Sequence, residues 1–282
     1  MARRIVRPAA LLITRPAIRL GVSADAATAV TWFTGIVAAV AISFPGLASA
    51  IVGVVLLQLW YLLDHVDGQI ARYHGRASLD GTALDYLMHH TIHLTVPLAI
   101  GIGLMRGRLA AIDSADAVAD VLPLALLDLL IGLAAGLLLM MLTLVHDVRY
   151  KAFITRLKRV HGRLQVEGGG GGRPEAQPAL PRNPIKLFAR LLRKICEMHV
   201  LMNVLTVMLP VAYLFPTWGI PTLRWSLAAL AVTAALLFAK TILRDLHRRA
   251  AEEEFARWFQ SPEGQTLVKR EGWWYVESDD ED

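Results

Sequence analysis

Long apolar stretches alternate with short polar ones along the 282-residue chain. No Asp, Glu, Lys or Arg occurs between Asp25 and Asp64 or between Glu197 and Arg224, and each stretch exceeds the ~20 apolar residues that cross a bilayer. The pattern predicts six transmembrane helices, with Pro45-Gly46 as the turn between the first two. Their expected ranges are 26–44, 47–63, 86–105, 121–145, 198–217 and 225–243.

The remaining segments are predicted to face the cytoplasm or the membrane surface. Leu187, Leu191 and Ile195 alternate with basic residues at helical spacing, which favours an amphipathic helix at the membrane interface over 185–196. An ordinary solvated basic helix is the alternative. The N-terminal stretch around Leu11–Arg15 admits the same interfacial interpretation. The expected fold is therefore all-α: a polytopic membrane protein with six transmembrane helices and interfacial amphipathic helices.

Five segments follow from this pattern: a cytoplasmic interfacial segment (1–25), four spans (26–145), a basic loop with a Gly/Pro-rich linker (146–197), two spans (198–243) and a cytoplasmic tail (244–282). Within the tail, 251–259 is predicted to be helical. The end, 271–282, closes on four consecutive acidic residues and is predicted to be solvated and unstructured.

Charge sets the expected orientation. With a cytoplasmic N-terminus, 25 of the 29 Lys and Arg residues lie inside, Lys240 lies within the last expected span, and only Arg106, Arg108 and Arg224 lie outside. Both termini are thus expected in the cytoplasm, in a multi-pass protein of the cell membrane. The net charge of +5 is explained by anionic lipid, and no nucleic-acid motif is present. A hydrophobic fraction of 55% excludes intrinsic disorder and fibrous repeats.

Cysteine and targeting patterns add little. The single cysteine, Cys196, excludes an internal disulfide and a Cys/His zinc cluster. No cleavable signal peptide is expected, because Arg15 interrupts the first apolar run.

The informative polar cluster lies between the second and third predicted spans. If the second helix continues past the membrane face, Asp64 and Asp67 share one face, while Gly81, Asp85 and His89 form a stripe on the third helix. Carboxylates gathered at one helix pair repel one another unless a divalent cation neutralises them, and oxygen ligands suit Mg²⁺ or Mn²⁺. Arg72 beside them offers a planar fork for a phosphate.

The spacing resembles the signature of the CDP-alcohol phosphatidyltransferases, Asp-x2-Asp-Gly-x2-Ala-Arg-x8-Gly-x3-Asp-x3-Asp. Seven of its eight specified positions are present: Asp64, Asp67, Gly68, Ala71, Arg72, Gly81 and Asp85. Six spans with the signature on the second and third agree with that family, and the Ser23–Asp25 stretch weakly resembles the polar start of its first span.

The resemblance implies the chemistry. Asp64, Asp67 and Asp85 would ligate two divalent ions, Mg²⁺ or Mn²⁺, that bridge the pyrophosphate of a CDP-linked donor such as CDP-diacylglycerol. Gly68, Ala71, Arg72 and Gly81 would form the nucleotide pocket. An acceptor alcohol would attack the β-phosphate and release CMP, in phospholipid biosynthesis. The implied partners are donor, acceptor and membrane lipids, and the implied assembly is a homodimer.

The last Asp of the signature, the family's metal ligand and general base, is His89 in this chain. Imidazole can act as a base near neutral pH and binds Mn²⁺ or Zn²⁺ more readily than Mg²⁺. One hypothesis is that His89 is the working base and that activity prefers Mn²⁺. The alternative is a catalytically inactive protein that binds metal and nucleotide-lipid as a sensor or scaffold. A cation transporter is disfavoured, because transporters bind ions near the bilayer midplane.

Other polar residues in the spans have two interpretations each. Asp128 is either functional or close enough to the outer face to reach water. His90 and His93 are either partners of the site residues or hydrogen-bonded structural residues, the second being favoured. His199 and Asn203 either line the acceptor pocket or form hydrogen bonds between helices, the second being favoured. The acceptor alcohol and the exact donor are not specified by any of these residues.

Overall fold

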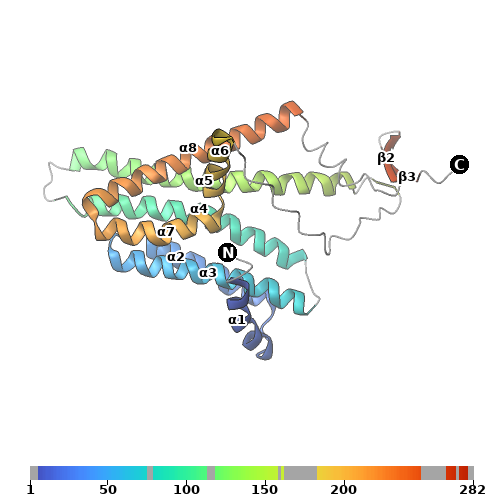
Figure 1. Cartoon of the computed structure of the whole chain (residues 1–282), viewed down its shortest axis with the longest axis horizontal. Coiled ribbons are helices and arrows are strands. Elements are labelled where there is room, and N and C mark those ends of the chain that lie inside the picture. Colours follow the sequence, from blue (N-terminus) through green and yellow to red (C-terminus); the bar gives the residue numbers. More distant parts are fainter. Residues whose placement is uncertain are drawn as a thin grey trace. The chain divides into compact units, whose positions relative to one another are not determined.

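The computed structural model describes residues 6–74, 79–112, 118–157, 160–161, 183–248, 265–270 and 273–278. The chain divides into two units, of which the first comprises residues 1–141 and 190–235 and the second 142–189 and 236–282. The eight helices of the described residues, shown in Figure 1, are α1 (Arg7–Arg19), α2 (Ala24–Ile42), α3 (Leu47–Tyr73), α4 (Leu79–Leu109), α5 (Val118–Leu157), α6 (Pro184–Ile195), α7 (Met198–Leu214) and α8 (Pro216–Arg248).

Five helices are long and apolar enough to cross a membrane: α2, α3, α4, the Val118–Val145 part of α5 and the Pro216–Asp245 part of α8. Helix α7, the sixth expected span, is apolar but has 17 residues. Its length of about 26 Å falls short of the ~30 Å hydrocarbon core. The helical, multi-pass character predicted from the sequence is confirmed, while the sixth crossing and the interfacial placement of α1 and α6 stay predictions.

Several helices extend beyond the expected spans: α4 begins at Leu79 rather than 86, and α5 ends at Leu157 rather than 145. Helix α3 continues past 63 through the polar signature to Tyr73, which is the condition under which Asp64 and Asp67 share one face. The predicted break over 218–224 is wrong: α7 ends at Leu214, Phe215 is non-helical with φ −124° and ψ 69°, and α8 begins at Pro216. Proline suits the first helical position because its missing N–H has no partner there in any case. Arg224 therefore lies inside α8.

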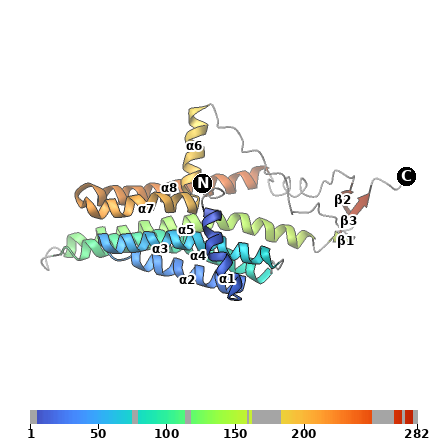
Figure 2. The same cartoon turned by 60° about the horizontal axis from the view of Figure 1, so that its bottom comes forward.

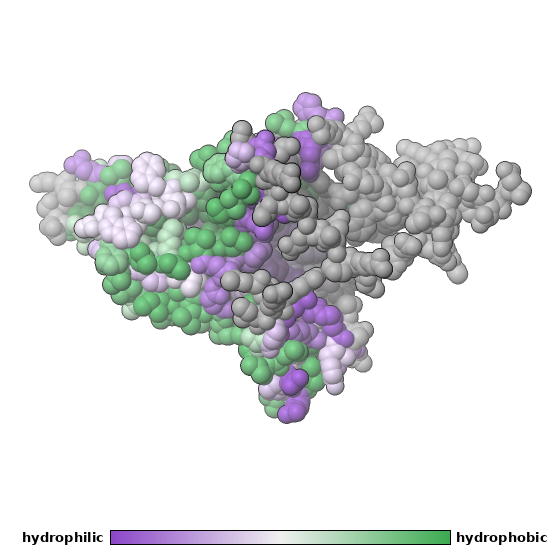
Figure 3. Space-filling model, in the orientation of Figure 1, coloured by the Kyte–Doolittle hydropathy of each residue, from purple (hydrophilic) through white to green (hydrophobic). Residues whose placement is uncertain are grey.

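The first unit is built around α3. Helices α1, α2 and α7 each contact α3, and α2 also contacts α4 (Figures 1 and 2). Leu57 and Trp60 of α3 are fully buried together with Ile92 of α4 and Leu205 of α7. Apolar side chains such as Phe33 and Val207 instead point outward, and Figure 3 shows the hydrophobic surface that results. An apolar exterior is what a lipid environment requires.

The second unit contains a small sheet that the sequence did not suggest. Strands β1 (Val160–His161), β2 (Gln265–Arg270) and β3 (Trp273–Ser278) lie in the order β1-β3-β2, with β2 and β3 antiparallel and β1 parallel to β3. The prediction of an unstructured end is thus wrong for 273–278, where aromatic and β-branched residues favour a strand. The helix predicted over 251–259 and the Gly/Pro-rich linker at 168–182 lie outside the described residues.

Candidate functional site

The polar ends of α3 and α4 form a cavity with the first turns of α1 and α2. The cavity has a volume of about 340 Å³, within the range of small-molecule sites. All eight residues singled out from the sequence line it: Asp64, Asp67, Gly68, Ala71 and Arg72 from α3, and Gly81, Asp85 and His89 from α4. The extension of α3 beyond the predicted span is what brings the two halves of the signature together.

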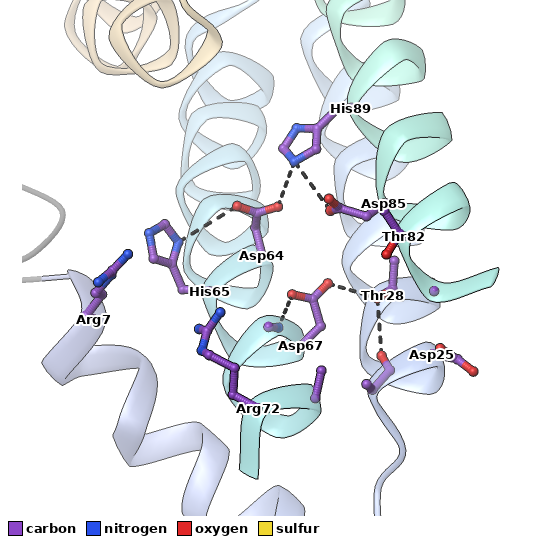
Figure 4. Close-up of a pocket in the computed structure, with 14 residues that line it drawn as sticks. Arg7, Asp25, Thr28, Asp64, His65, Asp67, Arg72, Thr82, Asp85 and His89 are labelled. Atoms are coloured by element: carbon purple, nitrogen blue, oxygen red, sulfur yellow. Dashed lines mark hydrogen bonds and ion pairs between the residues drawn. The ribbon is translucent and has the colours of Figure 1, made fainter. Parts of the chain in front are cut away.

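Asp64, Asp85 and His89 form the tightest group in the cavity. The Nε2 atom of His89 lies 3.1 Å from Oδ1 of Asp64 and 3.5 Å from Oδ1 of Asp85, as Figure 4 shows. One ligand atom from each residue lies within 4.8 Å of the others. Carboxylates only accept hydrogen bonds, so without an ion the Nε2 atom must carry the hydrogen between them.

Asp67 is held differently from the other two carboxylates. Its side chain is buried, Oδ2 accepts a 2.9 Å hydrogen bond from the Thr28 hydroxyl, and Oδ1 accepts one from the Gly68 N–H. It lines the same cavity but is not part of the group of three. A carboxylate has about four acceptor positions, so both oxygens retain capacity for a further ligand.

The opposite side of the cavity is cationic. Figure 4 shows Arg7, His65 and Arg72 on the side of α1, away from Asp85 and Thr28. The His65 Nδ1 atom lies 3.0 Å from the Tyr61 carbonyl oxygen, which accepts its hydrogen, and 3.8 Å from Asp64. A β-carbon at Gly68 would lie 3.3 Å from the Arg72 guanidinium, so glycine there leaves room for this side chain.

Sequence reasoning missed several residues of this cavity. Thr28, Arg7, His65 and Thr82 line it but belong to no spacing pattern. Asp25 also lines it, next to Ser23, which accepts a hydrogen bond from the Ala26 N–H as the N-cap of α2. The polar Ser23–Asp25 stretch was the available signal, whereas Thr28 could be recognised only from the fold.

The donor set fits a divalent cation. Two carboxylate oxygens with one imidazole nitrogen are ligands that Mn²⁺ accepts, and oxygen-rich groups also suit Mg²⁺. The neighbouring guanidinium of Arg72 carries a positive charge, and the N-terminus of α2 carries a partial one. Both would attract an anionic group bound beside the ion. The arrangement can therefore hold a metal and a phosphate side by side.

The other polar residues have structural partners. Asp128 is fully buried and pairs with Arg108 at 2.6 Å and with Arg224, so of its two interpretations the one in which it reaches water is wrong. His93 is buried, and its Nδ1–H donates to the His89 carbonyl oxygen, as expected of a structural histidine. Asn203 accepts an interhelical hydrogen bond from Gln58, which confirms the favoured interpretation, whereas His199 is half-exposed beside Glu197.

Comparison with known proteins gives a fold relationship. No protein-family model matches the chain, and no curated protein matches its sequence. Among solved structures, the chain is similar to the phosphatidylinositol phosphate synthase of Mycobacterium tuberculosis, crystallised with manganese and citrate. The match has a TM-score of 0.51 and 17% identity and covers 86% of this chain and 90% of that one. The likeness describes the fold.

Proposed function

We propose that the chain is a membrane transferase that moves a phosphatidyl or related phospho-alcohol group from a CDP-linked donor to an acceptor alcohol, with release of CMP. One observation carries the proposal: the seven matching signature residues and His89 line a single cavity, with Asp64, Asp85 and His89 within ligating distance of one another. The fold likeness to a phosphatidylinositol phosphate synthase supports it.

In this proposal the residues that line the cavity have separate roles. Asp64, Asp67 and Asp85 would hold Mg²⁺ or Mn²⁺, with two ions as the expected number, and the bound metal would supply neutralisation of the charge on the transferred and leaving phosphates. Thr28 fixes the orientation of Asp67. Arg72 grips phosphate oxygens in the space that Gly68 leaves, and Ala71 and Gly81 allow the nucleotide to approach both helices.

His89 is the proposed base. The acceptor hydroxyl oxygen attacks the β-phosphorus, the bond from that phosphorus to the α-phosphate oxygen breaks, and the hydroxyl proton passes to His89 Nε2 as CMP leaves. This requires Nε2 first to release to solvent the hydrogen that it shares with Asp64 and Asp85, as those carboxylates take up the metal, and then to face the substrate hydroxyl with its lone pair. The same contacts make His89 a candidate third ligand to a metal held by Asp64 and Asp85, and in that role Nε2 could not act as the base.

The test is the reverse reaction. Purified protein is given labelled CMP, Mn²⁺ or Mg²⁺ and total lipid from the native membrane, and incorporation of label into a CDP-lipid is measured. Incorporation that disappears in Asp85→Asn but persists in Asp80→Asn, an exposed residue of the same helix, would establish the transferase. The lipid consumed would identify the acceptor by mass.

The second candidate is an inactive sensor or scaffold, favoured by the histidine at the position of the family's last Asp. Metal-dependent binding of CDP-lipid without any label incorporation, with either metal, would select it. In both cases the implied homodimer is tested separately, by the mass of the purified protein in detergent.

A further inference from the structure

A second cavity lies on the other side of Arg72, between α1 and the end of α3. Helix α1 is fixed there by Ala10, which is buried against Val66 and Ile70. The Thr14 hydroxyl donates to Gln69 Oε1 at 2.6 Å, and Gln69 Nε2 donates to the Arg7 carbonyl oxygen at 3.1 Å. These side-chain contacts fix α1 against α3 and therefore define the cavity beside them.

This cavity has a volume of about 590 Å³ and a strongly basic lining. Arg15 and Arg19 of α1 and Arg72 of α3 line it, and no Asp or Glu does. Within the described part of the chain, none of these three guanidinium groups forms an ion pair. Three unneutralised guanidinium groups around one space attract an anion, and their planar forks match phosphate oxygens.

The same space has apolar walls. Leu11 and Ile18 of α1 line it beside the arginines, and Tyr73 adds an amphipathic ring. Leu11 and Leu12 are exposed, and Figure 3 shows hydrophobic and hydrophilic residues together over α1, at the bottom of the view. A soluble phosphate would leave the apolar walls uncovered, whereas a phospholipid places its phosphate on the arginines and its chains on the leucines.

We propose that this cavity, lined by Arg15, Arg19, Arg72, Leu11, Ile18 and Tyr73, binds the headgroup of an anionic phospholipid. Arg72 lines both this cavity and the candidate catalytic one. A lipid bound here would therefore contact the same arginine that lines the proposed nucleotide pocket. The proposal does not depend on the chain being a transferase.

The test is a binding measurement on the purified full-length chain in neutral detergent. The thermal unfolding midpoint is followed against dioctanoyl phosphatidic acid, with EDTA present so that no metal holds phosphate at Asp64 and Asp85. Saturable stabilisation is expected, with dioctanoyl phosphatidylcholine and inorganic phosphate each at least about tenfold weaker. The double variant R15Q/R19Q should weaken phosphatidic acid binding by about tenfold or more.

The matched control is R193Q/K194Q, which removes two exposed cations from α6. It should leave the affinity unchanged, and an equal loss in both doubles would mean general electrostatic attraction and overturn the proposal. Unchanged affinity in R15Q/R19Q, or equal binding of inorganic phosphate, would also overturn it. The charge-keeping variant R15K/R19K guards against a folding defect: it should bind phosphatidic acid more tightly than R15Q/R19Q but less tightly than the unaltered chain, and binding no tighter than R15Q/R19Q counts against the site. Turnover enters none of these readouts, so failure here is distinct from failure of the proposed transferase.

Discussion

His89 is the residue at which the chain departs from the signature it otherwise matches. The variant His89→Asp makes the group of three an all-oxygen site, which suits Mg²⁺ better than a mixed nitrogen and oxygen set. We expect the ratio of CMP release with Mn²⁺ to that with Mg²⁺ to fall by on the order of tenfold. The variant His89→Ala should lose about 10²-fold or more in turnover, as expected for removal of a general base.

His199→Asp is the control for this pair of variants, because His199 is half-exposed and lies outside the cavity. Its metal preference should equal that of the unaltered chain. Full turnover of His89→Ala with both metals would remove His89 from the mechanism.

Asp128 of α5 illustrates the effect of a single buried charge, at the opposite end of α4 from the candidate site. Its side chain has no exposed surface and accepts from Arg108 and Arg224, so replacing it leaves two guanidinium groups without their partner. Asp128→Asn should lower the free energy of unfolding in detergent by about 3–5 kcal/mol. Asp120→Asn, at an exposed position of the same helix, should change it by no more than about 0.5 kcal/mol. Equal changes in the free energy of unfolding for the two variants would contradict the burial of Asp128 between the two arginines.

The two clusters show which sites a sequence can reveal. The eight candidate site residues fall between Asp64 and His89, where helical spacing and the resemblance to the family signature together predicted one site, and all of them line one cavity. Asp128 pairs with residues 20 and 96 positions away, and no local pattern encodes such partners. The sequence therefore marked Asp128 as an unusual charged residue within a span, but it did not identify the two arginines that pair with it.

Among the helices, α4 and α5 approach most closely where glycines face the opposing backbone. A β-carbon at Gly136 of α5 would lie 2.3 Å from the Leu94 carbonyl oxygen of α4, a contact that only a backbone shift can relieve. Gly136→Ala should therefore destabilise the protein by about 1–3 kcal/mol. Gly107→Ala is the matched control, because its β-carbon would meet only the Pro45 side chain, at 3.6 Å.

Both substitutions gain the same helix propensity of up to about 1 kcal/mol, so the difference in their unfolding midpoints isolates the packing cost. A midpoint for Gly136→Ala equal to or above that of Gly107→Ala would mean that the two helices are not in the contact described.

The connection between α6 and α7 contains the only cysteine of the chain. Burial, and to a smaller extent the neighbouring Glu197 carboxylate, raises the pKa of the Cys196 thiol to about 11 from 9.0. Only the thiolate reacts, so at pH 7 a two-unit rise lowers the reactive fraction by about a hundredfold. Iodoacetamide should therefore label the folded protein at least about a hundredfold more slowly than the protein unfolded in guanidinium. Similar labelling rates in the folded and unfolded protein would show that the Cys196 thiol is not buried in the folded state.

Helix boundaries were predicted less well than helix identity, for physical reasons. Apolar runs located five long helices, because hydropathy reports the membrane environment directly. The end of α3 and the start of α8 depend instead on whether polar turns can remain helical, and both do. The hairpin of β2 and β3 was not predicted, because the acidic residues at the end of the chain indicated a solvated and unstructured tail.

At the scale of the whole molecule, the number of membrane crossings depends on whether α7 crosses the bilayer. Six crossings place both termini on one side of the membrane, whereas five place them on opposite sides. With a cytoplasmic N-terminus, six crossings place 25 Lys and Arg residues inside and 3 outside, an asymmetry that favours this arrangement. A 17-residue helix can cross if the bilayer thins locally or flanking side chains reach the interface.

Single cysteines introduced into a Cys196→Ala background distinguish these arrangements. His74→Cys follows α3, Ala111→Cys follows α4 and His247→Cys lies at the end of α8, all at exposed positions. A membrane-impermeant maleimide applied to intact cells should label Ala111→Cys, and should label the other two only after permeabilisation. Labelling of His247→Cys in intact cells, with His74→Cys still protected, would mean that α7 does not cross. Protection of Ala111→Cys with labelling of His74→Cys would invert the orientation and place the candidate site on the outer face, where cytoplasmic CDP-linked donors could not reach it.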